Sequence, residues 1–261
     1  MKRLSLLIIL TLGLLSAKAN HITGGEIFYT YLGQVGAKYQ YKITLMLFRH
    51  CGPVGAPLDN TAAIAIFDRL TGAMIENNNV TISQIVELNL TSPSPCIKNP
   101  PPVCYEVGYY EFTTTLSSSL NGYIIAYQRC CRIAGINNLF NSVGVGATYT
   151  AEIPGTAQLP TAFQNNSAHF VGPDTVIVCQ HNAFSYSFNA IDTDGDSLSY
   201  SFCDAYTCTS TPPNPNPPEA PPYQVVPYAP PFSGGQPMGS GVTINSKTGL
   251  VTGVAPDQGI M

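Results

Sequence analysis

Three aspartates at alternate positions form the clearest set of candidate metal ligands in the sequence. Asp192, Asp194 and Asp196 are separated by single residues within the run DTDGD. Carboxylate oxygens suit Ca²⁺, which takes about six to eight oxygen ligands. The run is not an EF-hand loop, because its glycine occupies the fourth position and Cys203, not glutamate, occupies the twelfth. Two interpretations stay open: a calcium site completed by other ligands, or a polar turn that uses Asp and Gly for its backbone conformation.

The cysteines form the second set of residues with chemistry of their own. If the chain is exported, as its N-terminus indicates below, they favour disulfides over thiolate metal sites. Two local pairs are predicted, Cys96 with Cys104 across a proline-rich loop and Cys203 with Cys208. Cys51 is predicted to pair with one of two adjacent cysteines. The eight candidates are Cys51, Cys96, Cys104, Cys130, Cys131, Cys179, Cys203 and Cys208.

The two adjacent cysteines close the run YIIAYQRCCR at residues 123–132. This run is predicted to be a buried strand, because it is rich in β-branched and aromatic residues and follows the turn pair Asn121-Gly122. Successive strand residues point to opposite faces, so Cys130 and Cys131 are expected to seek separate partners. Cys51 is the partner expected for one of them, which leaves Cys179 and the other twin unassigned. Two free buried thiols are the alternative.

Nucleophilic catalysis finds little support in the sequence. None of the four histidines (His21, His50, His169 and His181) lies in a local motif with a nucleophile. The sequence contains no Gly-x-Ser-x-Gly elbow, no His-Glu-x-x-His zinc motif and no phosphate-cradling glycine loop. A carboxylate pair for glycoside hydrolysis would be drawn from only 15 acidic residues, several of them in turns. We therefore expect a protein that is not an enzyme.

The N-terminus indicates the compartment. Lys2 and Arg3 precede an apolar run over residues 4–15, which is followed by Ser16 and then Ala17-Lys18-Ala19. These are the three parts of a secretory signal peptide, and the apolar run is too short to span a membrane. A retained anchor is the alternative. Residues 1–19 are therefore predicted to be a signal peptide, and the mature chain is predicted to be secreted or to lie on the outer cell surface, with no transmembrane segment.

Composition and charge narrow the partners. Charged residues make up 10% of the chain, and its formal charge is -4 with a pI near 5.5. Because no basic patch is present to neutralise phosphates, nucleic acid is not an expected partner. A surface protein or a glycan remains open. The scarcity of Lys and Glu also disfavours long amphipathic helices.

The spacing of apolar runs and turns predicts an all-β chain with two β-sandwich domains. The first domain is assigned to residues 20–155, a linker to 156–166 and the second domain to 167–261. Expected strands of the first domain are 26–32, 38–49, 62–67, 80–90 with a register break after Ile82, 105–116, 123–132 and 146–153. Expected strands of the second are 175–179, 183–190, 197–202, 242–244 and 250–252. The second sandwich is one strand short.

Several stretches resemble one family. Residues 21–27 (HITGGEI), 43–45 (ITL), 48–51 (FRHC) and 126–132 (AYQRCCR) resemble the N-terminal region of large secreted surface proteins of Bacteroidetes-type bacteria. Those proteins are associated with gliding motility and type IX secretion. The resemblance extends over nearly the whole mature chain, and the YQRCCR run is its most specific part. It implies display at the cell surface and a role in adhesion or motility, with further domains of the same chain.

A second resemblance concerns the C-terminal part. Residues 192–200 (DTDGDSLSY) and 242–253 (VTINSKTGLVTG) are similar to cadherin-like, immunoglobulin-type domains. In that group the second motif precedes a final strand, which is absent here. The resemblance therefore implies an Ig-like second sandwich that is truncated.

Three functions follow, in order of expectation. The first is a non-enzymatic surface module, stabilised by disulfides, for adhesion or gliding-related interaction. The second is a structural subunit that assembles by β-strand exchange, since an unfilled sandwich exposes its edges. The third is a carbohydrate-binding or carbohydrate-active protein.

Overall fold

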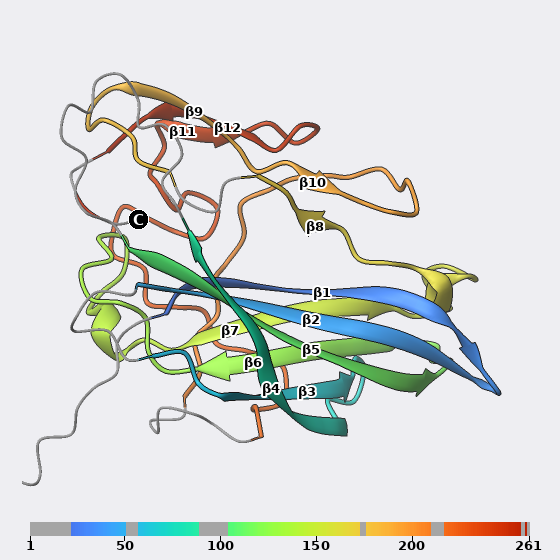
Figure 1. Cartoon of the computed structure of the whole chain (residues 1–261). Helices are drawn as coiled ribbons and strands as arrows, with labels where there is room; N and C mark the ends of the chain where they lie inside the picture. Colours follow the sequence, from blue (N-terminus) through green and yellow to red (C-terminus); the bar gives the residue numbers. More distant parts are fainter. Residues whose placement is uncertain are drawn as a thin grey trace, which may run out of the picture.

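The computed structural model describes residues 22–50, 57–88, 104–172, 176–209, 217–256 and 259. Nearly all regular structure in these residues is antiparallel β-sheet (Figure 1), so the predicted all-β class is confirmed. The helical elements found there are two short 3₁₀ turns, η1 (Ser142–Gly144) and η2 (Ala162–Gln164). No helix in the described part of the chain has the length and apolarity needed to cross a membrane.

A seven-stranded antiparallel sheet dominates the first half of the chain. Its strands follow the spatial order β1-β2-β5-β4-β3-β6-β7. Their bounds are β1 (Ile22–Val35), β2 (Lys38–His50), β3 (Thr61–Asp68), β4 (Met74–Leu88), β5 (Tyr105–Ser117), β6 (Gly122–Arg129) and β7 (Ala147–Pro154). All seven overlap strands that the hydrophobic alternation predicts.

Strand β4 turns this sheet into a sandwich-like arrangement of two layers. Its first part pairs with β3 from Met74 to Thr81, and its second part pairs with β5 from Ile82 to Leu88. The register shifts between Ile82 and Gln84, where the sequence predicts a break. Because one strand serves both layers, β1, β2 and β5 face β3, β6 and β7 across a shared interior.

Alternating side chains fill that interior. In β2, Ile43, Leu45 and Leu47 point inward and are at most 1% exposed. Burial of each such side chain contributes about 1.5–3 kcal/mol. Large aromatic rings from other strands complete the core, namely Tyr29, Tyr41, Tyr110 and Tyr127. Two of their hydroxyls find backbone acceptors, since Tyr41 donates to the carbonyl of Phe163 and Tyr110 to that of Asp59.

Glycine is required where β6 begins. Gly122 has φ = 84°, and a Cβ at this position would collide with the backbone of Ile153 and Pro154 in β7. The Asn121-Gly122 pair therefore sets the close approach of β6 to β7.

Five shorter strands lie beside the outer face of β1 and β2 (Figure 1). They are β8 (His169–Phe170), β9 (Ala183–Ser187), β10 (Ala190–Ile191), β11 (Val242–Ile244) and β12 (Leu250–Val254). Strands β8 and β10 pair with each other, and β11, β12 and β9 form a separate sheet in that order. The hairpin predicted around residues 245–249 is confirmed by the antiparallel pairing of β11 with β12.

Two predicted strands are wrong. Residues 176–179 and 197–202 are not strands, and Thr175 lies outside the described residues. Over residues 197–202 the serines are exposed while Leu198, Tyr200 and Phe202 are half-buried. The alternation thus predicts the buried face correctly, but no neighbouring strand supplies a hydrogen-bonded ladder.

A late segment of the chain returns to the first sheet. The backbone N–H of Thr148 in β7 donates to Tyr206 (3.1 Å), and Tyr206 forms a bridge with Val225. Tyr223 packs on the small outer face that β3 and β6 form with Ala65, Phe67 and Ala126. This late segment thus bonds to the edge of β7 through Tyr206 and packs on the outer face of the second layer through Tyr223.

Candidate functional site

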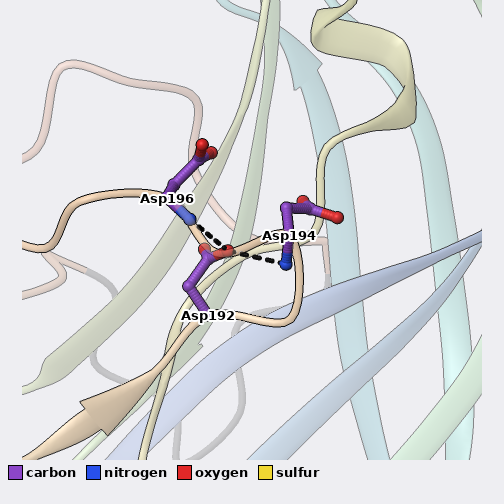
Figure 2. Close-up of side chains that lie close together, drawn as sticks. All are labelled: Asp192, Asp194 and Asp196. Carbon is purple, nitrogen blue, oxygen red and sulfur yellow. Dashed lines mark hydrogen bonds between the residues drawn. The ribbon is translucent and has the colours of Figure 1, made fainter.

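The three aspartates predicted as metal ligands lie on one turn after β10. The carboxylate of Asp192 accepts the backbone N–H groups of Asp194 (2.8 Å) and Asp196 (3.3 Å), as Figure 2 shows. Gly195 has φ = 80°, a conformation that glycine adopts without steric cost. Locally, then, Asp and Gly do serve the backbone of this turn, as one of the two interpretations holds.

Asp194 also ties the turn to the first sheet through Asn166. Its carboxylate accepts both the backbone N–H and the side-chain amide of Asn166, each at 2.6 Å. The Oδ1 atom of Asn166 accepts the backbone N–H of Tyr31 on the edge of β1 (2.7 Å). Next to it, Ser167 exchanges hydrogen bonds with the backbone of Tyr29. Asn166 and Ser167 thereby satisfy backbone groups of Tyr29 and Tyr31 on the edge of β1 that no described strand pairs.

The aspartate cluster fits a hard cation in part. One carboxylate oxygen from each residue lies within 4.8 Å of the others. Oxygens that bind the same Ca²⁺ at about 2.4 Å can be at most about 4.8 Å apart, so these separations are compatible with a shared site. It would supply three of about six to eight ligands, and Asp194 would be shared with Asn166. Bound calcium would hold the turn rigid, and its binding stays a prediction.

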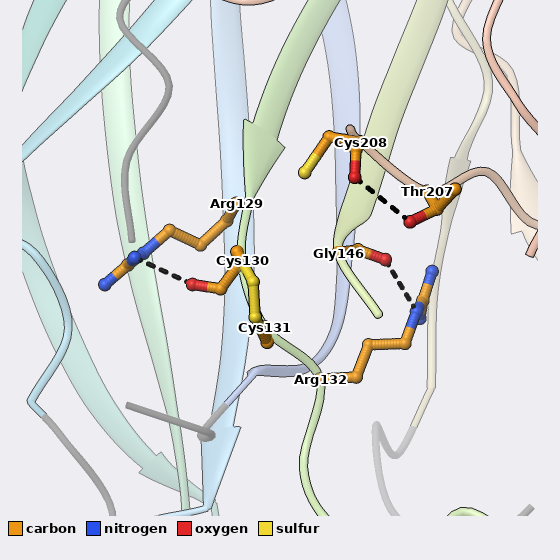
Figure 3. The surroundings of a disulfide bond; sticks show 7 residues. All are labelled: Arg129, Cys130, Cys131, Arg132, Gly146, Thr207 and Cys208. Carbon is orange, nitrogen blue, oxygen red and sulfur yellow. Dashed lines mark hydrogen bonds between the residues drawn. A yellow bond between two sulfur atoms is a disulfide. The ribbon is translucent and has the colours of Figure 1, made fainter. Parts of the chain in front are cut away.

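The adjacent cysteines are bonded to each other, which corrects the prediction of separate partners. Cys130 and Cys131 form a disulfide, with a Cα–Cα distance of 3.0 Å across a cis peptide (Figure 3). Strand β6 ends at Arg129, so the alternation of faces does not extend to the pair. Neither cysteine is therefore the partner of Cys51, which lies outside the described residues.

The predicted pair of Cys203 with Cys208 is also wrong, since both are free thiols. Tyr206 and Thr207 between them bond to Thr148 and Gln224, which keeps the segment extended. Five extended residues span roughly 16 Å, whereas a disulfide requires Cα atoms within about 7 Å. Burial raises the pKa of the Cys208 thiol, which lies against Gly146 (Figure 3).

Two other cysteines are disulfide-bonded. They are Cys104 and Cys179. Cys96, the predicted partner of Cys104, lies outside the described residues. That pairing therefore stays a prediction.

The three histidines that the structure describes take part in contacts away from any nucleophile. The ring of His50 meets Tyr105 edge-on, and that of His169 stacks on Phe28 at 5.1 Å. His181 is exposed, with φ = 56°, in the turn before β9. His21 lies outside the described residues.

A buried ion pair lies where β6 ends. The guanidinium of Arg129, 3% exposed, meets the carboxylate of Asp59 at 2.6 Å and donates to the carbonyl of Cys130 (2.8 Å). Arg132 leaves on the opposite side of the chain and donates to Gly146 (Figure 3). The Arg-Cys-Cys-Arg run is thus anchored in both directions.

Sequence reasoning missed an aromatic cleft on the outer face of β1 and β2. It is lined by Glu26, Phe48, Phe170 and Phe188, among others. These residues are far apart in sequence, and Phe170 and Phe188 lie outside any motif. The exposure of both rings beside the same cleft is a structural feature that no spacing in the sequence carries.

Comparison with protein-family models, with curated proteins and with solved structures found no match for this chain. What the protein does is therefore inferred from its residues and its fold.

Proposed function

We propose that the chain is an exported, non-enzymatic module of the bacterial cell surface, used for adhesion or gliding-related interaction. The predicted signal peptide at residues 1–19 and the resemblance to secreted Bacteroidetes-type surface proteins support this role. Such a role requires a stable scaffold that presents loops or a sheet face, and the all-β fold is suited to that purpose.

The observation that carries the proposal is the strand order of the first sheet. Its layers read β1-β2-β5-β4 and β3-β6-β7, with the first part of β4 added beside β3. In chain order this is the arrangement A-B-E-D and C-F-G of constant-type immunoglobulin sandwiches. We infer an Ig-like first domain, and for residues 167–261 a smaller cadherin-like unit. Ig-like sandwiches recur in extracellular recognition.

Surface display is tested on intact cells that express the full chain. We expect external protease to degrade the protein while a cytoplasmic control protein stays intact, and N-terminal sequencing to begin at Asn20 or His21. Resistance to protease together with a retained Met1 would overturn the proposal.

Adhesion is tested with the same cells. Those that carry the protein should attach to, or move over, a surface more efficiently than an isogenic deletion strain. Equal attachment and equal motility would contradict the adhesive role while leaving export intact.

Strand exchange is a second candidate, favoured by the edge of β9 that no strand among the described residues pairs. This strand is the last of the three-stranded sheet. Its sequence, AFSYS, contains neither charge nor proline, the two devices that usually protect an edge from pairing with another chain. A strand donated by a second chain could extend the sheet there.

A further inference from the structure

A cleft of about 300 Å³ lies between the first sheet and the shorter strands. One side is the outer face of β1 and β2, with Gly24, Gly25, Glu26 and Phe48. The opposite side comes from residues 170–172, Val176 and residues 186–188. Its volume is at the lower end of the range of small-molecule sites, about 300–1,000 Å³.

Aromatic rings form the walls of this cleft. Phe188 stands nearly perpendicular to Phe170 (80°, centroids 6.1 Å apart) and to Tyr186 (77°, 4.9 Å). Phe48 lines the opposite side. Phe170 and Phe188 remain 54% and 45% exposed, so both keep apolar surface that a ligand would remove from water. Walls that meet at right angles are the geometry of an aromatic cage.

A carboxylate supplies the charge of the cleft. Of the described residues that line it, Glu26 alone is charged. Its Oε1 accepts the backbone N–H of Phe170 at 3.0 Å, and this bond holds Phe170 against the outer face of β1. The negative charge therefore lies beside the rings.

We propose that this cleft binds a quaternary ammonium group. The faces of the rings attract a cation electrostatically, and the carboxylate of Glu26 adds to that attraction. A quaternary ammonium carries no N–H, so it needs nearby charge but no hydrogen-bond acceptor, and its methyl groups match the apolar walls. The site does not depend on where the protein is displayed, so a failure of the surface-exposure test would leave it standing.

A second hollow of about 250 Å³ extends the site. It shares Phe170 and Phe188 with the first and adds the hydroxyl-bearing Ser199, Tyr200 and Ser201. The polar remainder of a ligand such as choline would lie there, while its trimethylammonium group occupies the cage.

The test is an NMR titration of the full chain with choline chloride. The control ligand is 3,3-dimethylbutan-1-ol, which has the same shape without the charge. We expect saturable broadening of the N-methyl resonance of choline and an affinity at least about tenfold weaker for the alcohol. Equal affinity for the two ligands, or no binding of choline at tens of millimolar, would overturn the proposal.

Three variants locate the site. Glu26→Gln keeps an oxygen acceptor for the Phe170 N–H but removes the charge, and Phe188→Leu keeps apolar volume but removes a ring. Phe188→Leu should weaken choline binding by roughly 2- to 30-fold, the range of single cation–π contacts, and Glu26→Gln should weaken it through the lost charge. Phe140→Leu removes a ring that is 57% exposed elsewhere and should change nothing. Unchanged binding in both cleft variants, with melting temperatures that show they are folded, would overturn the assignment.

Vesicles distinguish a free ligand from a lipid headgroup. Sedimentation with phosphatidylcholine vesicles but not with phosphatidylglycerol vesicles would identify the trimethylammonium of a membrane surface as the ligand. Binding of choline without sedimentation would identify a free ligand. Both outcomes support the site. If neither free choline nor phosphatidylcholine vesicles bind, the proposal is contradicted.

Discussion

The buried ion pair of Arg129 and Asp59 shows how much one side chain can contribute to the stability of the fold. Arg129 is 3% exposed, and its guanidinium also holds the carbonyl of Cys130. Arg129→Met would leave the Asp59 carboxylate without its partner, so we expect the free energy of unfolding in urea to fall by about 3–5 kcal/mol.

The double variant Arg129→Met with Asp59→Asn is the control for this prediction. It removes both charges, so its loss should be smaller than the sum of the two single losses. A loss below about 1 kcal/mol in the single variant would show that the pair contributes little.

Buried tyrosines predict instability at alkaline pH. Burial raises the pKa of Tyr29 and that of Tyr149 to about 12, against about 10 in an unfolded chain. Between pH 10 and 12 the folded state therefore keeps protons that the unfolded state releases. The contribution of these tyrosines to the free energy of unfolding is fully present below pH 10 and is lost as the pH rises towards 12. Each tyrosine should cost about 2–3 kcal/mol over that interval.

Urea unfolding at pH 9, 10 and 11 measures this loss. Tyr149→Phe is the matched variant, because the Tyr149 hydroxyl finds no hydrogen-bond partner among the described residues. The variant should lose less stability per pH unit than the parent protein. The same slope in both proteins would contradict the assignment to Tyr149.

Asp194 is predicted to stabilise the chain through Asn166 even without a metal. Asp194→Ala removes two charge-assisted hydrogen bonds of 2.6 Å, so it should cost roughly 1 kcal/mol, or about 2–4 °C in melting temperature. Asp196→Ala, in the same turn, is the control and should melt within about 1 °C of the parent protein.

If calcium binds, it should raise the melting temperature of the parent protein, and excess chelator should reverse the rise. Calcium should then not raise the melting temperature of either variant, Asp194→Ala or Asp196→Ala.

The cysteines show what residue-scale reasoning could predict. Disulfide chemistry could be expected from the predicted export, and Cys104 and Cys179 are indeed bonded. The disulfide between Cys130 and Cys131 could not be predicted from the sequence, because it depends on β6 ending at Arg129, one residue before the pair. A strand boundary is set by the neighbours of the strand and not by its own propensity.

At the scale of elements, the edge of β9 predicts how the protein would assemble. Phe188 donates its backbone N–H to Gly249, so by alternation the N–H of Ser185 and that of Ser187 point to the free edge. If chains pair there, the oligomer should grow with concentration in light scattering, and Ser185→Pro should abolish it without breaking the β9–β12 ladder. Ser185→Thr keeps the N–H and should assemble normally. A monomer at all concentrations would exclude strand exchange.

Elements that the sequence predicts well are those that their own alternation or turn residues indicate. The alternation in β2 places Ile43, Leu45 and Leu47 correctly, and the hairpin around residues 245–249 follows from its turn residues. Residues 197–202 alternate equally well but find no ladder. The sharing of β4 between two layers could be anticipated only as a register break, since the break does not say which strand lies on each side.

At the scale of the whole molecule, late segments of the chain are packed on the first sheet. Residues 166–170 bond to β1, and within the described part of residues 204–228 Tyr206 bonds to β7 and Tyr223 packs on β3 and β6. The Pro-rich composition of this region predicts extended backbone but not its packing partner. Because such contacts join distant parts of the chain, the described regions should unfold together.

Tyr223→Ala tests this coupling from the side of the late segment. Tyr223 packs on Ala65, Phe67 and Ala126, so removal of its ring should cost about 3 kcal/mol. If the chain unfolds as one unit, calorimetry should show a single transition that moves down as a whole by roughly 6–12 °C. Tyr228→Phe is the milder control, since it removes only the hydroxyl that accepts the N–H of Ala205. Two transitions, of which Tyr223→Ala shifts one, would instead show that the late segment folds on a sheet that is already stable without it.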